Sequence, residues 1–239
     1  MSTKMMLAAM LAGMMAFTTV AQAQETAPKS DKAAEKDGSK EKSKDKAQKG
    51  KDKDKAKGLA VGDAAPDFKL TDTDGKEHSL AELTKSGKIV VLQWFNAECP
   101  YVKKHYGDAG NTFNDLHTKY NSKDVVIVAI NSNGDGMPGS GQATNAAAKK
   151  DWKMQYPILL DASGDIGRAY GAKNTPAMYI VGKDGKVAYM GAIDDDNGAD
   201  KPGKTNYVAN ALDQLIAGET VSTSQTKPYG CSVKYAKQK

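Results

Sequence analysis

The sequence predicts an α/β fold for residues 58–217. Two runs rich in β-branched residues, 88–95 and 124–131, have the continuous apolar character of strands buried on both faces. The segment between them has helical character, and two buried strands joined through a helix form a βαβ unit with a parallel pair. About 180 residues follow the charged N-terminal region, enough for one domain with a hydrophobic core.

Residues 1–23 have the pattern of a signal peptide. Lys4 precedes an apolar stretch rich in Met and Ala, and residues 21–23, Ala-Gln-Ala, form a small-x-small cleavage site. The apolar stretch is short for a membrane span. We therefore expect export to the periplasm, or secretion if the source has no outer membrane. The mature chain would begin at Gln24 and carry no integral membrane segment.

Residues 24–57 are rich in charge and nearly free of large apolar side chains. The segment holds twelve lysines and eight acidic residues, and it cannot bury enough apolar surface to offset its ordering entropy. We expect a disordered tether that acts as a spacer; weak adhesion to an anionic envelope surface is the less favoured alternative. Basic and acidic residues balance from residue 58 onward, and no recognition motif is present, so no nucleic-acid partner is expected.

The predicted domain opens with a hairpin and a short helix. Asp74 and Gly75 lie between two short semi-apolar runs, which is typical of a hairpin turn. Ser79 is placed to cap a helix over 79–84, with Glu82 at the capping-box position.

Cys99 stands where the buried strand at 88–95 ends and a helix begins. Pro100 follows it, and proline is favoured in the first turn of a helix because its missing N–H would have had no partner. Unpaired backbone N–H groups and the helix dipole favour a thiolate at this position, and Lys103 and Lys104 add positive charge. We favour a reactive cysteine over an inert core thiol.

The remaining elements are predicted from apolar patterning and turn residues. They are a helix over 99–120 that breaks around 107–110, a mobile glycine-rich loop at 132–144, a helix at 146–154, a strand at 157–160, a helix at 164–170, a hairpin of strands at 177–181 and 186–191, and an amphipathic helix at 205–217. The glycine-rich loop matches neither the P-loop nor the dinucleotide fingerprint, so no cofactor is predicted.

Two segments carry a resemblance to a known family. Residues 94–100, Trp-Phe-Asn-Ala-Glu-Cys-Pro, resemble the active-site segment of thioredoxins of the cell envelope. Thr175 and Pro176, before a strand, resemble the cis-proline loop of the same fold, and cis peptide bonds are largely confined to X-Pro. These two segments and the order of elements over 61–217 make the chain similar to the redoxin group of the thioredoxin-like superfamily. This group contains the alkyl hydroperoxide reductase/thiol-specific antioxidant-like proteins.

The resemblance implies a central mixed β-sheet flanked by helices, with an N-terminal β-hairpin and a C-terminal extension at 218–239. It implies a thiol-disulfide oxidoreductase or a peroxiredoxin-like antioxidant in cell redox homeostasis. Its substrates would be protein thiols, protein disulfides or peroxides, and an external thiol would reduce it. The implied substrate-binding residues are Trp94, Asn96, Pro100, Thr175 and Pro176.

The chain departs from the family pattern at several positions, one of which is Leu92 in place of an expected proline. Val102 stands where a thioredoxin has its second cysteine, so the usual Cys-x-x-Cys disulfide cannot form. Asn96 replaces the Thr or Ser that typically precedes a peroxidatic cysteine. The arginine that typically supports peroxide cleavage in peroxiredoxins is missing from the segment at 174–176. Arg168 lies on the preceding predicted helix. These departures argue against an efficient peroxidase.

The chemistry must be carried by two cysteines, Cys99 and Cys231. A Cys99 thiolate forms a mixed disulfide with a disulfide and a sulfenic acid with a peroxide. Cys231 is the internal thiol available to resolve either intermediate, so we favour Cys99 as nucleophile and Cys231 as resolving cysteine. A permanent Cys99–Cys231 disulfide in a non-catalytic binding or envelope-stress protein is the alternative.

Other polar residues carry less chemistry. His105 lies six residues after Cys99, so on a regular helix it would point away from Cys99 and face solvent. The acidic run at 194–196 is predicted to be a solvated turn because it does not match a calcium-binding loop. No metal is predicted, since clustered histidines and paired cysteines are missing. Trp94 and Phe95 are better explained by packing than by a ligand-binding aromatic box.

Overall fold

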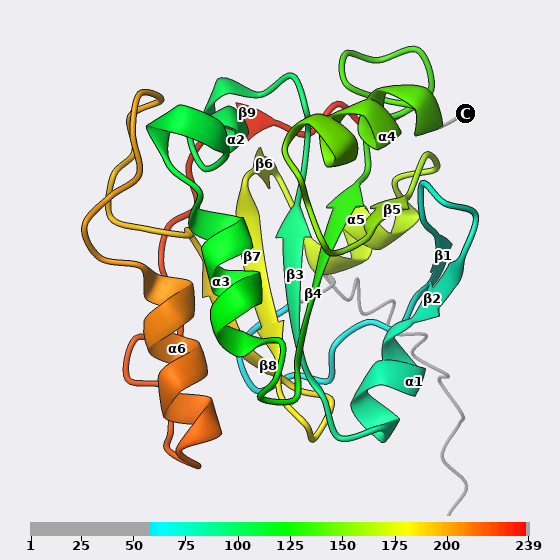
Figure 1. Cartoon of the computed structure of the whole chain (residues 1–239). Helices are drawn as coiled ribbons and strands as arrows, with labels where there is room; N and C mark the ends of the chain where they lie inside the picture. Colours follow the sequence, from blue (N-terminus) through cyan, green and yellow to red (C-terminus); the bar gives the residue numbers. More distant parts are fainter. Residues whose placement is uncertain (1–57, 238–239) are drawn as a thin grey trace, which may run out of the picture. The chain divides into compact units, whose positions relative to one another are not determined.

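The computed structural model describes residues 58–237 (Figure 1). The predicted signal peptide at 1–23 and the tether at 24–57 lie outside these residues. Five strands form the central sheet in the order β5-β4-β3-β7-β8. They are β3 (Ile89–Trp94), β4 (Val125–Asn131), β5 (Ile158–Leu160), β7 (Ala177–Val181) and β8 (Val187–Gly191).

The sheet is mixed, as predicted. Strand β3 pairs in parallel with β4 and antiparallel with β7, while β5 extends the parallel side and β8 the antiparallel side. All six residues of β3 are buried, which explains why its sequence is apolar without alternation. The βαβ unit and the late hairpin are therefore confirmed.

The hairpin and helix at the start of the domain are also confirmed. Strands β1 (Lys69–Thr71) and β2 (Glu77–Ser79) pair antiparallel around the predicted turn. Helix α1 (Leu80–Lys85) begins after Ser79, whose hydroxyl accepts a hydrogen bond from the backbone N–H of Glu82 at 3.3 Å. The side chain therefore satisfies one N–H group of the first turn.

The predicted helix over 99–120 is divided. It forms α2 (Pro100–Lys103), the 3₁₀ turn η1 (Gly107–Ala109) and α3 (Thr112–Tyr120). The later helices are α4 (Gln142–Asp151), α5 (Asp165–Tyr170) and α6 (Tyr207–Ile216). Helix α4 begins four residues before the predicted start, because its first turn is polar and hides the apolar periodicity that marks a helix.

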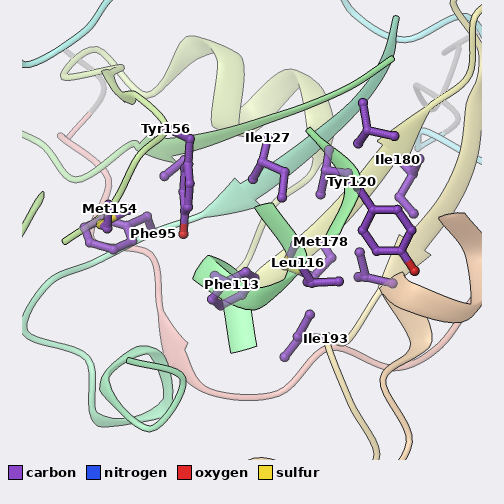
Figure 2. Packing of buried hydrophobic residues seen from close by; sticks show 14 of the residues in the cluster. Phe95, Phe113, Leu116, Tyr120, Ile127, Met154, Tyr156, Met178, Ile180 and Ile193 are labelled. Atoms are coloured by element: carbon purple, nitrogen blue, oxygen red, sulfur yellow. The ribbon is translucent and has the colours of Figure 1, made fainter. Parts of the chain in front are cut away.

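The hydrophobic core lies on both faces of the sheet. Alternate residues of β3 point to opposite faces, so Val91 joins one cluster and Leu92 the other. Helices α3 and α6 cover the first cluster, part of which is shown in Figure 2, while α1 and α5 cover the second. Cys99 belongs to the first cluster.

The C-terminal extension adds a strand that sequence patterning does not predict. Strand β9 (Cys231–Ser232) pairs antiparallel with β6 (Asn174–Thr175), close to the start of α2 (Figure 1). Among residues 58–237, no helix is long and apolar enough to cross a membrane.

Candidate active site

Cys99 occupies the junction between β3 and α2, as predicted. It is the N-cap residue of α2, and Pro100 opens the helix. The turn before it is stabilised by Asn96, whose side-chain Oδ1 accepts from the Glu98 N–H at 2.8 Å and whose carbonyl accepts from the Cys99 N–H at 3.1 Å. The Cys99 side chain is almost fully buried, with 2% of the residue exposed.

The Cys99 sulfur is not held by the helix N-terminus. Its side chain makes no capping hydrogen bond to α2, which is only one turn long. Instead, Sγ donates to the backbone carbonyl of Thr175 at 3.1 Å. The sequence therefore predicts the position of Cys99 but not its partner, because that partner lies 76 residues away in the chain.

Thr175 and Pro176 lie beside Cys99. The peptide bond between them is cis, which confirms the predicted cis-proline loop. On its other side, Thr175 pairs with Cys231 of β9, so one residue contacts both cysteine-bearing segments. The structure thus brings together four of the predicted site residues: Cys99, Thr175, Pro176 and Cys231.

Cys231 is half-buried and interacts with Cys99. Both cysteines are free thiols. The pKa of Cys231 is raised to about 11, first by burial and then by hydrogen bonding to Cys99 and the charge of Cys99. Lys234 opposes this shift. Both cysteine-bearing segments therefore meet at Thr175, although Cys231 lies 132 positions after Cys99 in the sequence.

Gly230 allows this close approach. Its φ of +109° lies in a region that favours glycine, and a Cβ at this position would overlap the Thr175 carbonyl oxygen. The glycine therefore lets the extension lie directly against the strand that contacts Cys99.

Asn96 shapes the site through a loop. Its Nδ2 donates to the Pro138 carbonyl at 3.3 Å, and a Cβ on Gly139 would overlap the Asn96 side chain. Asn131 also donates to the Gly139 carbonyl, at 2.8 Å. The loop predicted to be mobile is therefore tied to the domain by side-chain amides, and the Asn96 amide contacts this loop.

Trp94 has a packing role. The side chain is fully buried in the cluster on the opposite face of the sheet from Cys99. Its ring packs against Tyr170 and Tyr179, and Nε1 donates to Ser132 Oγ at 3.1 Å. The substrate-binding role predicted for Trp94 is corrected accordingly, because this side chain offers no surface to a substrate.

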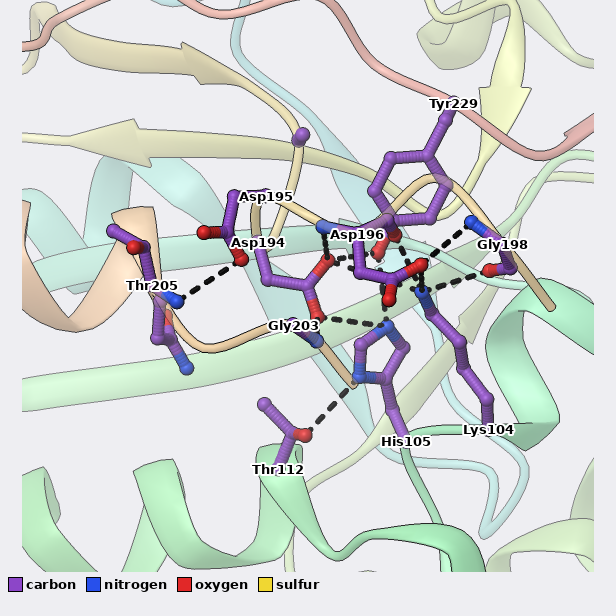
Figure 3. Close-up of polar contacts among 12 residues, drawn as sticks. Lys104, His105, Thr112, Asp194, Asp195, Asp196, Gly198, Gly203, Thr205 and Tyr229 are labelled. Atoms are coloured by element: carbon purple, nitrogen blue, oxygen red, sulfur yellow. Dashed lines mark hydrogen bonds and ion pairs between the residues drawn. The ribbon is translucent and has the colours of Figure 1, made fainter. Parts of the chain in front are cut away.

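One prediction after α2 is wrong and another holds only in part. His105 is completely buried rather than solvent-facing, and in the acidic run at 194–196 the Asp194 carboxylate is buried while Asp195 is exposed. Lys104 is also buried, and its Nζ donates to the carbonyls of Asp196 at 2.6 Å and Gly198 at 2.9 Å (Figure 3). The Lys104 ammonium therefore binds carbonyl groups of the loop after β8 instead of stabilising a Cys99 thiolate.

The length of α2 explains the error for His105. The prediction assumes a regular helix that continues from Cys99, but α2 ends at Lys103. Burial lowers the pKa of His105 to about 4, an effect that Asp194 opposes and Lys104 reinforces. Tyr229 contacts His105, Asp194 and Lys104, and no local sequence pattern predicts its role.

Arg168 contacts the C-terminal extension. Its guanidinium donates to the Ala236 carbonyl at 2.8 Å and lies 4.9 Å from the centre of the Tyr235 ring. A second hydrogen bond joins it to the Ser163 carbonyl. The only arginine of the chain therefore holds the extension against α5.

Comparison with known proteins decides the family. A family model described as Redoxin matches residues 60–208. The chain belongs to the redoxin family. A solved structure of an uncharacterized conserved protein from Geobacillus kaustophilus is 31% identical, with a TM-score of 0.68 over 76% of this chain and 95% of that one. The hypothetical protein SMc02350 from Sinorhizobium meliloti is 26% identical, with a TM-score of 0.66 over 76% and 98%.

Curated relatives of this redoxin carry a functional name. Thiol-disulfide oxidoreductase ResA from Bacillus thuringiensis subsp. konkukian is 30% identical over 130 residues, which cover 53% of this chain and 66% of the relative. The protein of the same name from Bacillus subtilis is 28% identical over 152 residues, 61% of this chain and 78% of the relative. The mixed sheet, the family match and the likeness to the solved structures confirm the thioredoxin-like fold predicted from the resemblance.

Within residues 58–237, no group of three or more His, Cys, Asp or Glu side chains is placed to hold a metal ion. The described chemistry of the site is that of two thiols beside a cis-proline loop.

Proposed function

We propose that this redoxin is a thiol-dependent oxidoreductase in which Cys99 is the nucleophile and Cys231 the resolving cysteine. One observation carries the proposal. Strand β9 pairs Cys231 with Thr175, and the Thr175 carbonyl accepts the hydrogen bond from Cys99. Fold alone does not supply such an arrangement, and the functional name of the curated relatives agrees with it.

The reaction on a disulfide has two exchange steps. Cys99 loses its proton, and its thiolate attacks one sulfur of the substrate, forming a mixed disulfide and releasing a thiolate. Cys231 then loses its proton, attacks Cys99 Sγ and displaces the second substrate thiolate. The substrate disulfide gains two electrons, and the two cysteines lose two as they form a disulfide. An external thiol would reduce that disulfide and complete the cycle.

The burial of Cys99 favours a peroxide as a second oxidant. With 2% of Cys99 exposed and β9 covering Thr175, a small molecule meets less obstruction than a protein does. Thiolate attack on a peroxide oxygen gives Cys99 sulfenic acid and an alcohol or water. Cys231 would then form the disulfide and release water. This branch would make the protein an antioxidant.

We also propose that the protein acts outside the cytoplasm. The signal-peptide pattern at 1–23 supports export, and export would place the protein in the periplasm of a Gram-negative source. An oxidising compartment suits a pair of thiols that cycles through a disulfide.

The test uses dithiobis(nitrobenzoate), an aromatic disulfide that releases one coloured thiolate for each bond exchanged. Reduced mature protein should release two thiolates in sequence, and Cys231→Ser should release one and retain a mixed disulfide on Cys99. Cys99→Ser should react slowly, through Cys231 alone. If Cys99 reacts no faster than an unfolded control peptide, the structural-disulfide alternative is preferred. If no second thiolate appears, Cys231 does not resolve the mixed disulfide and the proposed mechanism is refuted.

A further inference from the structure

We propose that Tyr229 is a positioning residue for the resolving step, which fixes the Cys231 thiol in reach of Cys99 through a buried polar cluster. The inference rests on the proposed function, because it concerns the second step of that reaction, the attack of Cys231 on Cys99. The polar cluster consists of Tyr229, Lys104, His105 and Asp194 (Figure 3).

Tyr229 is held on three sides. Its hydroxyl donates to Asp194 Oδ1 at 2.5 Å and hydrogen-bonds with His105 Nε2 at 3.2 Å. The Lys104 ammonium lies 4.5 Å from the centre of its ring. Because the hydroxyl proton is committed to Asp194, His105 Nε2 carries the hydrogen of the second bond. A hydrogen bond to a buried carboxylate is about twice as strong as a neutral one.

The partners of Tyr229 are themselves fixed. Asp194 Oδ2 accepts from the Gly203 N–H at 2.6 Å, and His105 Nδ1 bonds to Thr112 Oγ1 at 3.1 Å. Lys104 and His105 have 2% and 0% of their surfaces exposed. Tyr229 therefore contacts side chains that are buried, and Asp194 and His105 have hydrogen bonds of their own.

Helix α2 connects this cluster to the nucleophile. Cys99 is the N-cap residue of α2, Lys104 is its C-cap residue, and His105 follows directly. The cluster and Cys99 thus lie at the two ends of one helical turn. A tyrosine fixed at one end places the extension relative to the thiol at the other end.

The path from Tyr229 to Cys231 is short. One residue separates them, and that residue is Gly230, whose backbone lies against Thr175. Cys231 then pairs with Thr175, the residue that accepts the Cys99 hydrogen bond. Few backbone torsions therefore separate the anchored ring from the resolving sulfur.

Position matters because the resolving step needs alignment. The Cys231 thiolate must attack Cys99 Sγ as the leaving thiolate departs on the other side, so the bond formed and the bond broken share one sulfur. Holding two groups near this geometry replaces an encounter by an intramolecular step, and small displacements cost much of the rate. Because Tyr229 lies two positions before Cys231, fixing its ring restricts the direction from which the Cys231 sulfur approaches Cys99 Sγ.

Tyr235 offers a matched control. It also lies on the extension, its hydroxyl donates to the Ala172 carbonyl at 2.5 Å, and its ring carries a cation, Arg168. Its partners belong to α5 and the segment after it, apart from α2. Tyr235→Phe therefore removes the same atom from a similar contact on the other side of Cys231.

The experiment follows both thiolates released from dithiobis(nitrobenzoate) in a stopped-flow instrument, with the mature protein and each variant. Tyr229→Phe keeps the ring, so the fold and the first phase should be unchanged. The second phase should slow about tenfold or more, since one charge-assisted hydrogen bond is lost. Tyr235→Phe should slow the second phase by less than about threefold. Intact mass should show the Cys99 mixed disulfide accumulating in Tyr229→Phe only.

Two further measurements separate positioning from general loosening. The equilibrium between the Cys99–Cys231 disulfide and glutathione gives the effective concentration of Cys231, which should fall about tenfold in Tyr229→Phe. His105→Gln removes one partner and keeps Tyr229, and it should slow the second phase less than Tyr229→Phe does. This variant replaces Tyr229→Phe if the latter fails to fold.

The outcomes distinguish the inference from the function on which it rests. A wild-type protein that releases no second thiolate refutes the proposed function itself. A normal wild-type second phase that Tyr229→Phe leaves unchanged refutes the inference alone. Equal slowing by Tyr229→Phe and Tyr235→Phe also refutes it, because the effect would then belong to the whole extension.

Discussion

Two tyrosines hold the C-terminal extension against the domain, one on each side of Cys231. Tyr229 and Tyr235 each donate a hydroxyl hydrogen bond of 2.5 Å, and each ring lies close to a cation. Their partners differ. Tyr229 reaches the buried carboxylate of Asp194, while Tyr235 reaches the neutral carbonyl of Ala172. The two contacts look alike, but only Tyr229 is bound to residues that adjoin α2.

The comparison separates two tasks that one extension performs. Fastening the chain to the domain can be shared by both tyrosines, and each hydroxyl would contribute about 1 kcal/mol, more where the acceptor is charged. Placing the Cys231 thiol near Cys99 depends on the Tyr229 end of the extension, because the partners of Tyr229 adjoin α2 and Cys99 is the N-cap residue of that helix. Stability and resolving rate should therefore respond differently to changes at the two ends.

The largest effect is expected when the thiol between the two tyrosines is removed. Cys231→Ser should abolish the intramolecular disulfide and leave Cys99 in a mixed disulfide, because both tyrosines then hold a group that cannot resolve it. Intact mass after one equivalent of dithiobis(nitrobenzoate) measures this directly. Complete disulfide formation between two molecules of the variant would instead show that Cys231 is dispensable.

The next largest effect is expected from substitutions at two glycines. Gly230 follows Tyr229 in the sequence, and Gly164 lies against the Tyr235 ring. Gly230 and Gly164 both have positive φ, and an added Cβ would overlap Thr175 in the first case and Tyr235 in the second. Changing either to Ala should lower the free energy of unfolding by roughly 1–3 kcal/mol. Only Gly230→Ala should slow disulfide formation, on the order of 100-fold, because it displaces Cys231 from Thr175.

Stopped-flow rates and urea unfolding of the two glycine variants provide the check. Equal losses of stability with unequal losses of rate are the expected pattern. If Gly164→Ala slows disulfide formation as much as Gly230→Ala, the two ends of the extension are equivalent and the comparison fails.

A smaller effect concerns pH, because the Tyr229 end contains a histidine. The pKa of His105 falls from 6.5 to about 4 on folding, through burial, with Asp194 opposing and Lys104 reinforcing the shift. Below pH 6.5 the unfolded chain binds more protons than the folded protein. The free energy of unfolding should therefore decrease as pH falls from 6.5 to 4, on the order of 3 kcal/mol from this residue.

Urea unfolding of wild type and His105→Gln at several pH values measures this contribution. The variant should lose less stability than wild type over the same pH interval. Parallel pH profiles for the two proteins would contradict the assignment to His105.

The smallest effect is a shift in the pKa of Cys231. Burial and the interaction with Cys99 raise this pKa from 9.0 to about 11. In Cys99→Ala the second cause is lost and burial remains, so the pKa should fall below that of the wild type while staying above 9.0. The pH dependence of Cys231 alkylation, followed by peptide mass, reports the value. An unchanged profile would mean that the two thiols do not interact.

The sequence predicts the Cys99 side of the site well because its signals are local. A continuous apolar run marks β3, and Pro100 after Cys99 marks the first turn of α2. The cis-proline loop is likewise visible in Thr175 and Pro176. Each of these features is contained in a few consecutive residues, and the structure bears out each one.

The Cys231 side could not be predicted because its contacts are distant in the sequence. Asp194 and Tyr229 are 35 residues apart, and no periodicity connects them. Strand β9 has only two residues, too few for a pattern of alternation. The burial of His105 escapes prediction for a related reason, since it depends on where α2 ends and on a loop after β8.

Peptide mapping without reduction tests the central claim most directly. Reduced mature protein is treated with one equivalent of a disulfide or a peroxide, alkylated and digested. We predict rapid conversion of both thiols to a Cys99–Cys231 disulfide within one chain. If Cys99 is oxidised while Cys231 remains a free thiol, or if Cys99 remains reduced with both oxidants, the nucleophile-and-resolver account is contradicted.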